Sequence, residues 1–164
     1  MLKLIAALST NRVIGRENGL PFRLRDDLRR FKEQTGKEAV FGGSNTYFSI
    51  PAQFRPLPGR ENIVLTRHPN RFDGEGVTVV TSLDIVVERA QTENIWVIGG
   101  GEIYTLTLPF VTEMYLTRVH ANIRGDTQFP EWNPEEWTLV SSEYRPADEK
   151  NEYPLTWEIH RRKP

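Results

Sequence analysis

The sequence predicts an α/β fold with a mostly parallel sheet and helices on both of its faces. Three observations favour this fold: short apolar, β-prone runs alternate with helical patterns, the last third is almost purely β-like, and 164 residues suit one domain with a substantial core. No repeat, low-complexity tract or long linker divides the chain, so residues 1–164 are expected to form a single domain.

Hydrophobic periodicity places the individual elements. The strands expected in the alternating region are Leu2–Leu8, Ala39–Gly43, Asn62–Thr66, Val77–Val80 and Ile95–Ile98. The helices expected between them are Leu24–Thr35, Asn45–Ile50, Leu83–Ala90 and Glu102–Leu108. Little helix separates the last three expected strands, which predicts an antiparallel hairpin at the end of the sheet: Glu113–His120, Thr138–Tyr144 and Leu155–His160.

Composition excludes several classes of function. A formal net charge of −1 gives no reason to expect nucleic acid or an anionic membrane as a partner. The absence of cysteine rules out disulfides and thiolate catalysis and suits a reducing compartment, so we expect a cytoplasmic protein. The histidines are far apart and lack metal-ligand spacing, and no apolar run approaches the roughly 18–20 residues of a membrane helix. The apolar start, Met1–Leu8, is better explained as a buried strand than as a secretion signal.

A glycine turn follows the most apolar predicted strand. Ile95–Ile98 runs directly into Gly99, Gly100 and Gly101, and a helix begins at Glu102. Such a turn brings bare backbone N–H groups up to a phosphate or a flat ring. The alternative is that close packing leaves no space for side chains there.

Asp27 is an acid on the apolar face of a predicted helix. At 3.6 residues per turn it lies within the stripe of Leu24, Leu28 and Phe31, whereas Asp26 points away from it. A buried carboxylate is costly unless something pairs with it, so Asp27 is a candidate for binding a ligand. The alternative is helix capping, because an acid in the first turn suits the helix dipole.

Four other features suggest ligand contacts. The Ser9–Arg23 segment has no clear periodicity and predicts a lid or binding loop. Arg60 lies in a turn, where it is either solvated or available to a ligand carboxylate. Arg67 follows a strand at the edge where open α/β sheets bind phosphates. Thr117 lies in an alternating strand, where core packing and a hydrogen bond to a ligand are both possible.

A series of short segments carries a joint signal in its order and spacing. These segments are Leu4–Ala7, Val13–Gly15, Glu17–Asn18, Leu20–Pro21, Asp27–Leu28, Phe31–Lys32, Leu57–Arg60 with Asn62, Val97–Gly101, Ile103–Tyr104, Tyr115–Thr117, Gly125–Thr127 and Phe129–Pro130. Together they resemble the dihydrofolate reductase family along nearly the whole chain. The resemblance implies an eight-stranded, mostly parallel twisted sheet with an antiparallel C-terminal strand and four flanking helices. It also implies an adenosine-binding subdomain at roughly residues 38–92.

The resemblance further implies an enzyme of one-carbon metabolism and a target of antifolates. The oligomeric state stays open on the sequence, with a monomer as the default because the pattern of charged helix faces is unbroken, and no metal is expected. The implied reaction is NADPH-dependent reduction of 7,8-dihydrofolate to 5,6,7,8-tetrahydrofolate, by hydride transfer from the nicotinamide to the pterin. By this analogy Asp27 is the essential carboxylate that holds the pterin, and Thr117 bridges to the ring through its hydroxyl and water. Phe22 completes the catalytic group but departs from the family, which usually has Trp there.

The residues that the resemblance assigns to substrate are Ile5, Ala6, Ala7, Leu20, Asp27, Leu28, Phe31, Ser49, Ile50, Arg55, Leu57, Arg60, Ile98, Tyr104 and Thr117. Those that it assigns to NADPH are Ala7, Val13, Ile14, Gly15, Asn18, Gly19, Leu20, Gly43, Ser44, Asn45, Thr46, Leu65, Thr66, Arg67, Ile98, Gly99, Gly100, Gly101, Glu102, Ile103, Tyr104 and Thr127. The family also has a cis peptide bond at Gly99–Gly100. Since Ser44 stands where the family commonly has Arg, Arg67 is left as the main anchor for the 2′-phosphate.

Two other functions stay open on the sequence. One is a reductase of related fold that acts on another heterocycle, such as the ribosylaminopyrimidine of riboflavin synthesis; Asp27 and Arg60 argue against it, because that substrate has no glutamate tail. The other is a catalytically silent folate or nucleotide binder, which Phe22 and Ser44 slightly favour.

Overall fold

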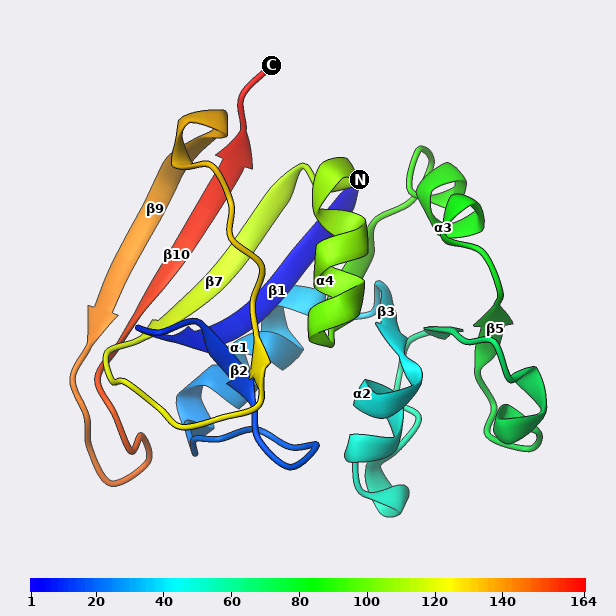
Figure 1. Cartoon of the computed structure of the whole chain (residues 1–164), viewed down its shortest axis with the longest axis horizontal. Coiled ribbons are helices and arrows are strands. Elements are labelled where there is room, and N and C mark those ends of the chain that lie inside the picture. The colour runs from blue at the N-terminus through cyan, green and yellow to red at the C-terminus, as the bar shows by residue number, and fades with distance from the viewer.

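An eight-stranded sheet forms the centre of the molecule in a computed structural model that describes all 164 residues (Figure 1). The strand order is β5-β4-β3-β6-β1-β7-β10-β9. These strands are β1 (Leu2–Ser9), β3 (Ala39–Gly43), β4 (Asn62–Leu65), β5 (Thr78–Val80), β6 (Ile95–Gly99), β7 (Glu113–Val119), β9 (Trp137–Arg145) and β10 (Leu155–Arg162). The pairs of β10 with β7 and with β9 are antiparallel, and all other pairs in this sheet are parallel, which confirms the expected C-terminal hairpin.

Four α-helices flank the sheet, and α4 lies in front of β1 while α1 lies behind it (Figure 1). Their bounds are α1 (Arg25–Thr35), α2 (Ser44–Ser49), α3 (Leu83–Arg89) and α4 (Gly101–Thr107). Short 3₁₀ turns occur at Ala52–Phe54, Pro69–Phe72, Leu108–Phe110 and Pro134–Glu136. Every helix and strand expected from periodicity is present, with ends that differ by two residues at most. None of the helices has the length and apolar character that crossing a membrane requires.

The Ser9–Arg23 segment is more ordered than the sequence predicts. Its residues Val13–Gly15 form β2, which pairs antiparallel with β8 (Thr127–Gln128) in a separate two-stranded sheet. The expectation of a structureless loop was therefore wrong for these residues. A strand this short shows no periodicity of its own, and its partner lies far along the chain, so neither signal was visible in the sequence.

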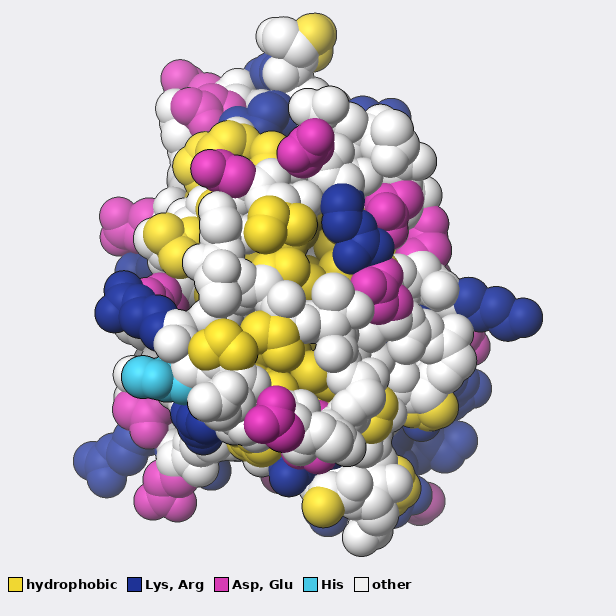
Figure 2. All heavy atoms as spheres, turned by 90° about the vertical axis from the view of Figure 1, so that its right-hand side faces the viewer, with side chains coloured by type: hydrophobic (Ala, Val, Ile, Leu, Met, Phe, Trp, Pro, Cys, Tyr) yellow, Lys and Arg dark blue, Asp and Glu magenta, His cyan; other side chains and the backbone are white.

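The two faces of β1 hold the two layers together. Leu4 and Ala6 belong to the main apolar core, together with Ile103 of α4. Ile5 points to the other face, where Phe31 of α1 packs against its cluster. Because successive side chains of a strand alternate between faces, this one strand supports helices on both sides. On the side nearest β5 and α3, basic and acidic side chains are interspersed around small apolar areas (Figure 2).

Candidate active site

The Asp27 side chain extends from α1 to two neighbouring strands. Thr117 of β7 donates its hydroxyl hydrogen to Oδ1 of Asp27, and the Trp157 indole Nε1 of β10 donates to the same oxygen at 3.0 Å. Thr117 and Trp157 are directly opposite each other in the register of β7 and β10, so their side chains share one face. No side chain or backbone group donates to Oδ2. One carboxylate oxygen is thus held by the protein, and the other is available to a ligand.

The electrostatic environment of Asp27 combines desolvation with stabilising donors. Burial raises the pKa of Asp27 above its ordinary value, because enclosure disfavours the charged form. The hydrogen bonds from Thr117 and Trp157 and the charge of Arg30 act in the opposite direction and favour the carboxylate. A desolvated acid that accepts two hydrogen bonds is typical of a catalytic or ligand-binding site.

Helix capping does not account for Asp27. The residue at the N-cap of α1 is Leu24, and no backbone N–H of the helix donates to the Asp27 carboxylate. Asp26 is the first-turn acid with structural partners, since it accepts from Arg29 at 2.7 Å and from Asn151 at 2.9 Å. The two adjacent acids therefore have different roles.

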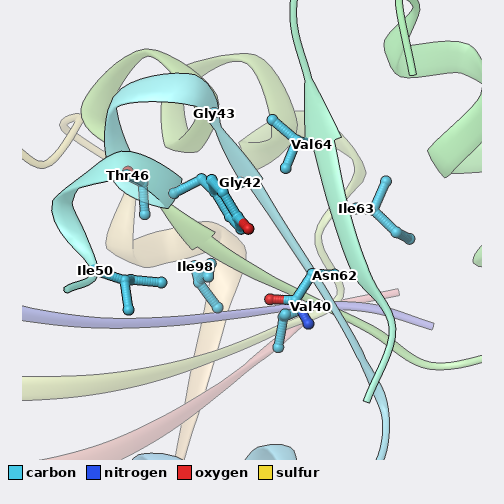
Figure 3. A pocket seen from close by; sticks show the side chains of 10 residues that line it. Val40, Gly42, Gly43, Thr46, Ile50, Asn62, Ile63, Val64 and Ile98 are labelled. Atoms are coloured by element: carbon cyan, nitrogen blue, oxygen red, sulfur yellow. The ribbon is translucent and has the colours of Figure 1, made fainter. Parts of the chain in front are cut away.

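An apolar wall lies beside the acid. Four of the predicted substrate contacts pack in one cluster: Ile5, Phe31, Leu57 and Ile98. Thr46, Ile50 and Ile98 turn toward a shared crevice between α2 and β6 (Figure 3). Two other predicted contacts, Leu20 in the lid and Leu28 of α1, are large apolar side chains that are 62% and 50% exposed. Exposed apolar side chains of this kind are candidates for contact with an apolar ligand.

The glycine turn after β6 is closely packed. The Gly99–Gly100 peptide bond is cis, as the resemblance implied, and Gly99 has a φ of 116°. A Cβ added to Gly101 would lie 2.9 Å from Thr127 Cγ2, and one added to Gly42 would lie 2.9 Å from the Gly99 carbonyl oxygen. Packing therefore requires glycine here, as the alternative interpretation held. The same packing leaves a backbone surface at the carboxyl edge of β3 and β6.

Tyr104 links that turn to β1. Its hydroxyl donates to the Ile5 carbonyl oxygen at 2.8 Å, and the side chain is buried. Burial, followed by the nearby charge of Asp27, raises the pKa of Tyr104, so the phenol is neutral. The tyrosine fixes the start of α4 against the strand that carries Ile5.

The loop that contains β2 is tied to the segment before β8. The Glu17 backbone N–H donates to Asp126 Oδ2 at 2.9 Å, and the Asp126 N–H donates to the Gly15 carbonyl oxygen at 3.0 Å. Within the loop, Arg16–Gly19 closes a tight hairpin in which Glu17 and Asn18 both have positive φ, as in a type I′ turn. These contacts hold the predicted lid residues in one position.

Arg60 and Arg55 differ in their surroundings. Arg60 donates from Nη1 to the Thr35 hydroxyl and from Nε to the Pro58 carbonyl oxygen at 3.0 Å, which holds its guanidinium at the C-terminal end of α1. Arg55 instead pairs with Glu75 at 3.4 Å and donates to carbonyl oxygens near the end of α2. Arg55 is thus engaged within the protein, and its assignment to substrate stays a prediction.

Arg67 is exposed two residues beyond the end of β4 and forms no ion pair or hydrogen bond through its side chain. The neighbouring Thr66 is buried, and its Oγ1 accepts from the His68 N–H at 3.0 Å. Ser44 begins α2, close to the carboxyl end of the adjacent strand β3. These groups lie at the edge of the sheet where ligands bind in open α/β folds.

Most of the remaining predicted residues lie on the same edge or on the lid. They are Ala6 and Ala7 of β1, Val13 and Ile14 of β2, Gly19 of the lid, Gly43 of β3, Asn45 and Ser49 of α2, Leu65 of β4, and Glu102 of α4. Phe22 lies in a separate apolar cluster that also contains Trp157. Trp157 is a contact that sequence reasoning missed: its strand was predicted, but the helix that its side chain meets was not.

Comparison with known proteins agrees with this geometry. Residues 1–162 match the family described as Dihydrofolate reductase. The dihydrofolate reductase of Bacillus subtilis (strain 168) is 40% identical over 164 residues, with 99% of this chain and 95% of that protein covered. The Haemophilus influenzae dihydrofolate reductase is 41% identical over 161 residues, with 98% of each covered. A solved structure of dihydrofolate reductase from Enterococcus faecalis, complexed with NADP(H) and RAB-propyl, superposes with a TM-score of 0.92 at 34% identity, covering 100% of this chain and 97% of that one. The chain belongs to the dihydrofolate reductase family.

Proposed function

We propose that this protein reduces 7,8-dihydrofolate to 5,6,7,8-tetrahydrofolate by hydride transfer from NADPH, with Asp27 as the essential carboxylate. Family membership supports the reaction and the cofactor. The assignment of this role to Asp27 rests on the unequal hydrogen bonding of its two carboxylate oxygens. Oδ1 accepts two hydrogen bonds, whereas Oδ2 has no protein donor. An acid held in this way, on the helix whose Phe31 packs against the apolar cluster of Ile5, can accept N–H groups from the edge of a pterin.

The proposed role of Asp27 is electrostatic. Its carboxylate accepts from the 2-amino group and the ring N–H of the pterin, and Thr117 fixes its orientation. An enclosed anion favours positive charge on the ring, which makes the imine nitrogen easier to protonate even if the proton arrives from water. NADPH, when bound, supplies the hydride.

The proposed cofactor site is the carboxyl edge of the sheet. The turn at Gly99–Gly101 presents backbone without side chains, and Thr46 and Thr127 pack directly against it. This shape fits a pyrophosphate, and the exposed Arg67 beyond β4 fits the adenosine 2′-phosphate. Residues 38–92, which include β3 to β5 with α2 and α3, form the proposed adenosine-binding subdomain.

Arg60 is the proposed partner of the substrate's glutamate α-carboxylate. Its guanidinium is held by Thr35 and Pro58 but forms no salt bridge, so its charge is available to an anion. A planar guanidinium is well suited to bind a carboxylate through two hydrogen bonds. We further expect a monomer acting in the cytoplasm, since the chain has no cysteine and carries mixed charge on its surface.

A direct spectrophotometric assay tests the function. Purified protein is mixed with NADPH and dihydrofolate, and the loss of the reduced-nicotinamide absorbance is followed. Rapid loss that depends on both compounds is the expected result. Binding of both without turnover would instead support a silent folate binder, and turnover only with another heterocycle would support a reductase of related fold.

A further inference from the structure

The indole of Trp157 belongs to the same hydrogen-bonded unit as the proposed essential acid. Its Nε1 donates to Asp27 Oδ1 at 3.0 Å, and its strand partner Thr117 donates to that same oxygen. Because the two donors lie opposite each other on paired strands, the sheet fixes the distance between them. Two donors converging on one oxygen define the plane of the carboxylate better than either could alone.

The Trp157 ring is itself firmly held. It is 8% exposed and packs in an apolar cluster with Phe22 and Leu155, neither of which offers a polar donor. The guanidinium groups of Arg30 and Arg145 each lie 5.1 Å from the centre of a Trp157 ring, as in cation–π contacts. The ring, together with these two arginines, lines a polar groove of about 270 Å³.

We propose that Trp157 is a positioning residue for the reaction: with Thr117 it fixes Oδ1 of Asp27, so that Oδ2 is left in a set orientation to accept from the substrate. Loss of the indole N–H leaves Thr117 as the one protein donor to the carboxylate, so the plane of the carboxylate is less firmly fixed. Only the expected change in kcat/KM rests on the proposed function; the hydrogen bond and its effect on Asp27 do not.

The other charged and titratable groups around this unit are on four elements. They are Arg30 on α1, Tyr104 on α4, Tyr115 on β7, and Glu143 and Arg145 on β9. Of these, Arg30 favours the Asp27 carboxylate directly, and Asp27 in turn raises the pKa of Tyr104. None of them replaces the donor that Trp157 supplies to Oδ1.

The test uses Trp157→Phe, which keeps an aromatic ring but removes the donor. Trp137→Phe is the matched control, because Trp137 is also buried and also lies against an arginine, 4.3 Å from Arg162, but hydrogen-bonds no acid. The pKa of Asp27 is measured by ¹³C NMR on protein labelled at the aspartate carboxyl carbons, with Asp27→Asn to assign the signal. Steady-state kinetics with NADPH and dihydrofolate are measured across pH.

We expect Trp157→Phe to raise the pKa of Asp27 by about one pH unit, as expected for removing a donor to an ionised group. The value of kcat/KM at neutral pH should fall roughly tenfold, and Trp137→Phe should change neither quantity. An unchanged pKa, or equal losses in both variants, would overturn the proposal.

A measurement on the unmodified protein keeps the proposal testable if Trp157→Phe does not fold. The ¹H–¹⁵N signal of the Trp157 indole should shift with pH along the titration of Asp27 and stop doing so in Asp27→Asn. An indole signal that ignores that titration would refute the hydrogen bond. Because this readout needs no turnover, its failure is distinguishable from failure of the proposed function.

Discussion

Glu17 in the lid loop donates its backbone N–H to Asp126, which lies more than a hundred residues later, at 2.9 Å. The same acid returns a bond from its own N–H to the Gly15 carbonyl oxygen, so the loop is tied at two adjacent points. The donor from Glu17 is the largest factor that lowers the pKa of Asp126, and the tie therefore persists at all pH values above the ordinary range of an aspartate.

Asp126→Ala should loosen the lid without unfolding the protein. Asp126 is exposed, so the thermal midpoint Tm is expected to change little, whereas hydride transfer should slow several-fold because the loop is less well placed. Single-turnover kinetics with a deuterated cofactor separate this step from product release. Asp126→Asn keeps one acceptor oxygen, so its hydride-transfer rate should lie between the rates of the unmodified protein and of Asp126→Ala. Equal rates in all three proteins would contradict the role of the Glu17–Asp126 hydrogen bond.

Arg60→Ala should weaken binding of the substrate tail. We expect the KM for dihydrofolate to rise by about tenfold or more, with a small change in kcat, because the lost contact is to a part of the substrate that does not react. A dihydropterin without the glutamate tail provides the control and should be reduced equally well by both proteins. If the substitution raises the KM of both substrates to the same extent, Arg60 does not bind the glutamate tail.

Arg67→Ala should narrow the preference for NADPH over NADH. The guanidinium is exposed and unpaired, so its removal should change the stability of the protein little. It should weaken NADPH binding, because the 2′-phosphate loses its proposed partner. Dissociation constants measured by fluorescence should show about tenfold weaker NADPH binding and unchanged NADH binding. Lys37→Ala removes another exposed charge just before β3, at the opposite edge of the sheet, and should leave both constants unaltered.

Asp27→Asn should make the protein more stable at neutral pH. The folded-state pKa of Asp27 is raised, so the native state binds a proton more tightly than the unfolded state, and stability falls as pH rises through that window. An amide avoids this loss and can still accept from Thr117 and Trp157. Calorimetry should show a Tm a few degrees higher at pH 7, where roughly 1 kcal/mol corresponds to about 2–4 °C. The gain should shrink as the pH is lowered toward the ordinary pKa of 3.8; a constant difference would contradict the raised pKa.

The fold was predictable because most of its signals are local. Strands such as Ile95–Gly99 are apolar runs bounded by glycine, and α1 carries its apolar stripe at helical spacing. Asp27 could be singled out for the same reason, since an acid in that stripe contradicts the pattern. Capping was the competing explanation, and only the neighbouring Asp26, with its bonds to Arg29 and Asn151, shows which acid supports the helix.

What the sequence could not predict depends on pairings between distant segments. β2 is stabilised by β8 and by contacts of Asp126, none of which leaves a trace in the periodicity of Ser9–Arg23. Trp157 is likewise separated by 130 positions from the acid that it contacts. Its strand pattern places it on an inner face, but only the strand order β7-β10-β9 brings that face to α1.

The most direct test of the central claim is the steady-state rate of Asp27→Asn with NADPH and dihydrofolate at neutral pH. A correctly folded variant should lose at least about 100-fold in kcat/KM, because a neutral amide cannot stabilise positive charge on the pterin. Asp26→Asn, which changes the adjacent acid on the outer side of the same helix, should retain nearly full activity. A folded Asp27→Asn protein with an undiminished rate would contradict the mechanism.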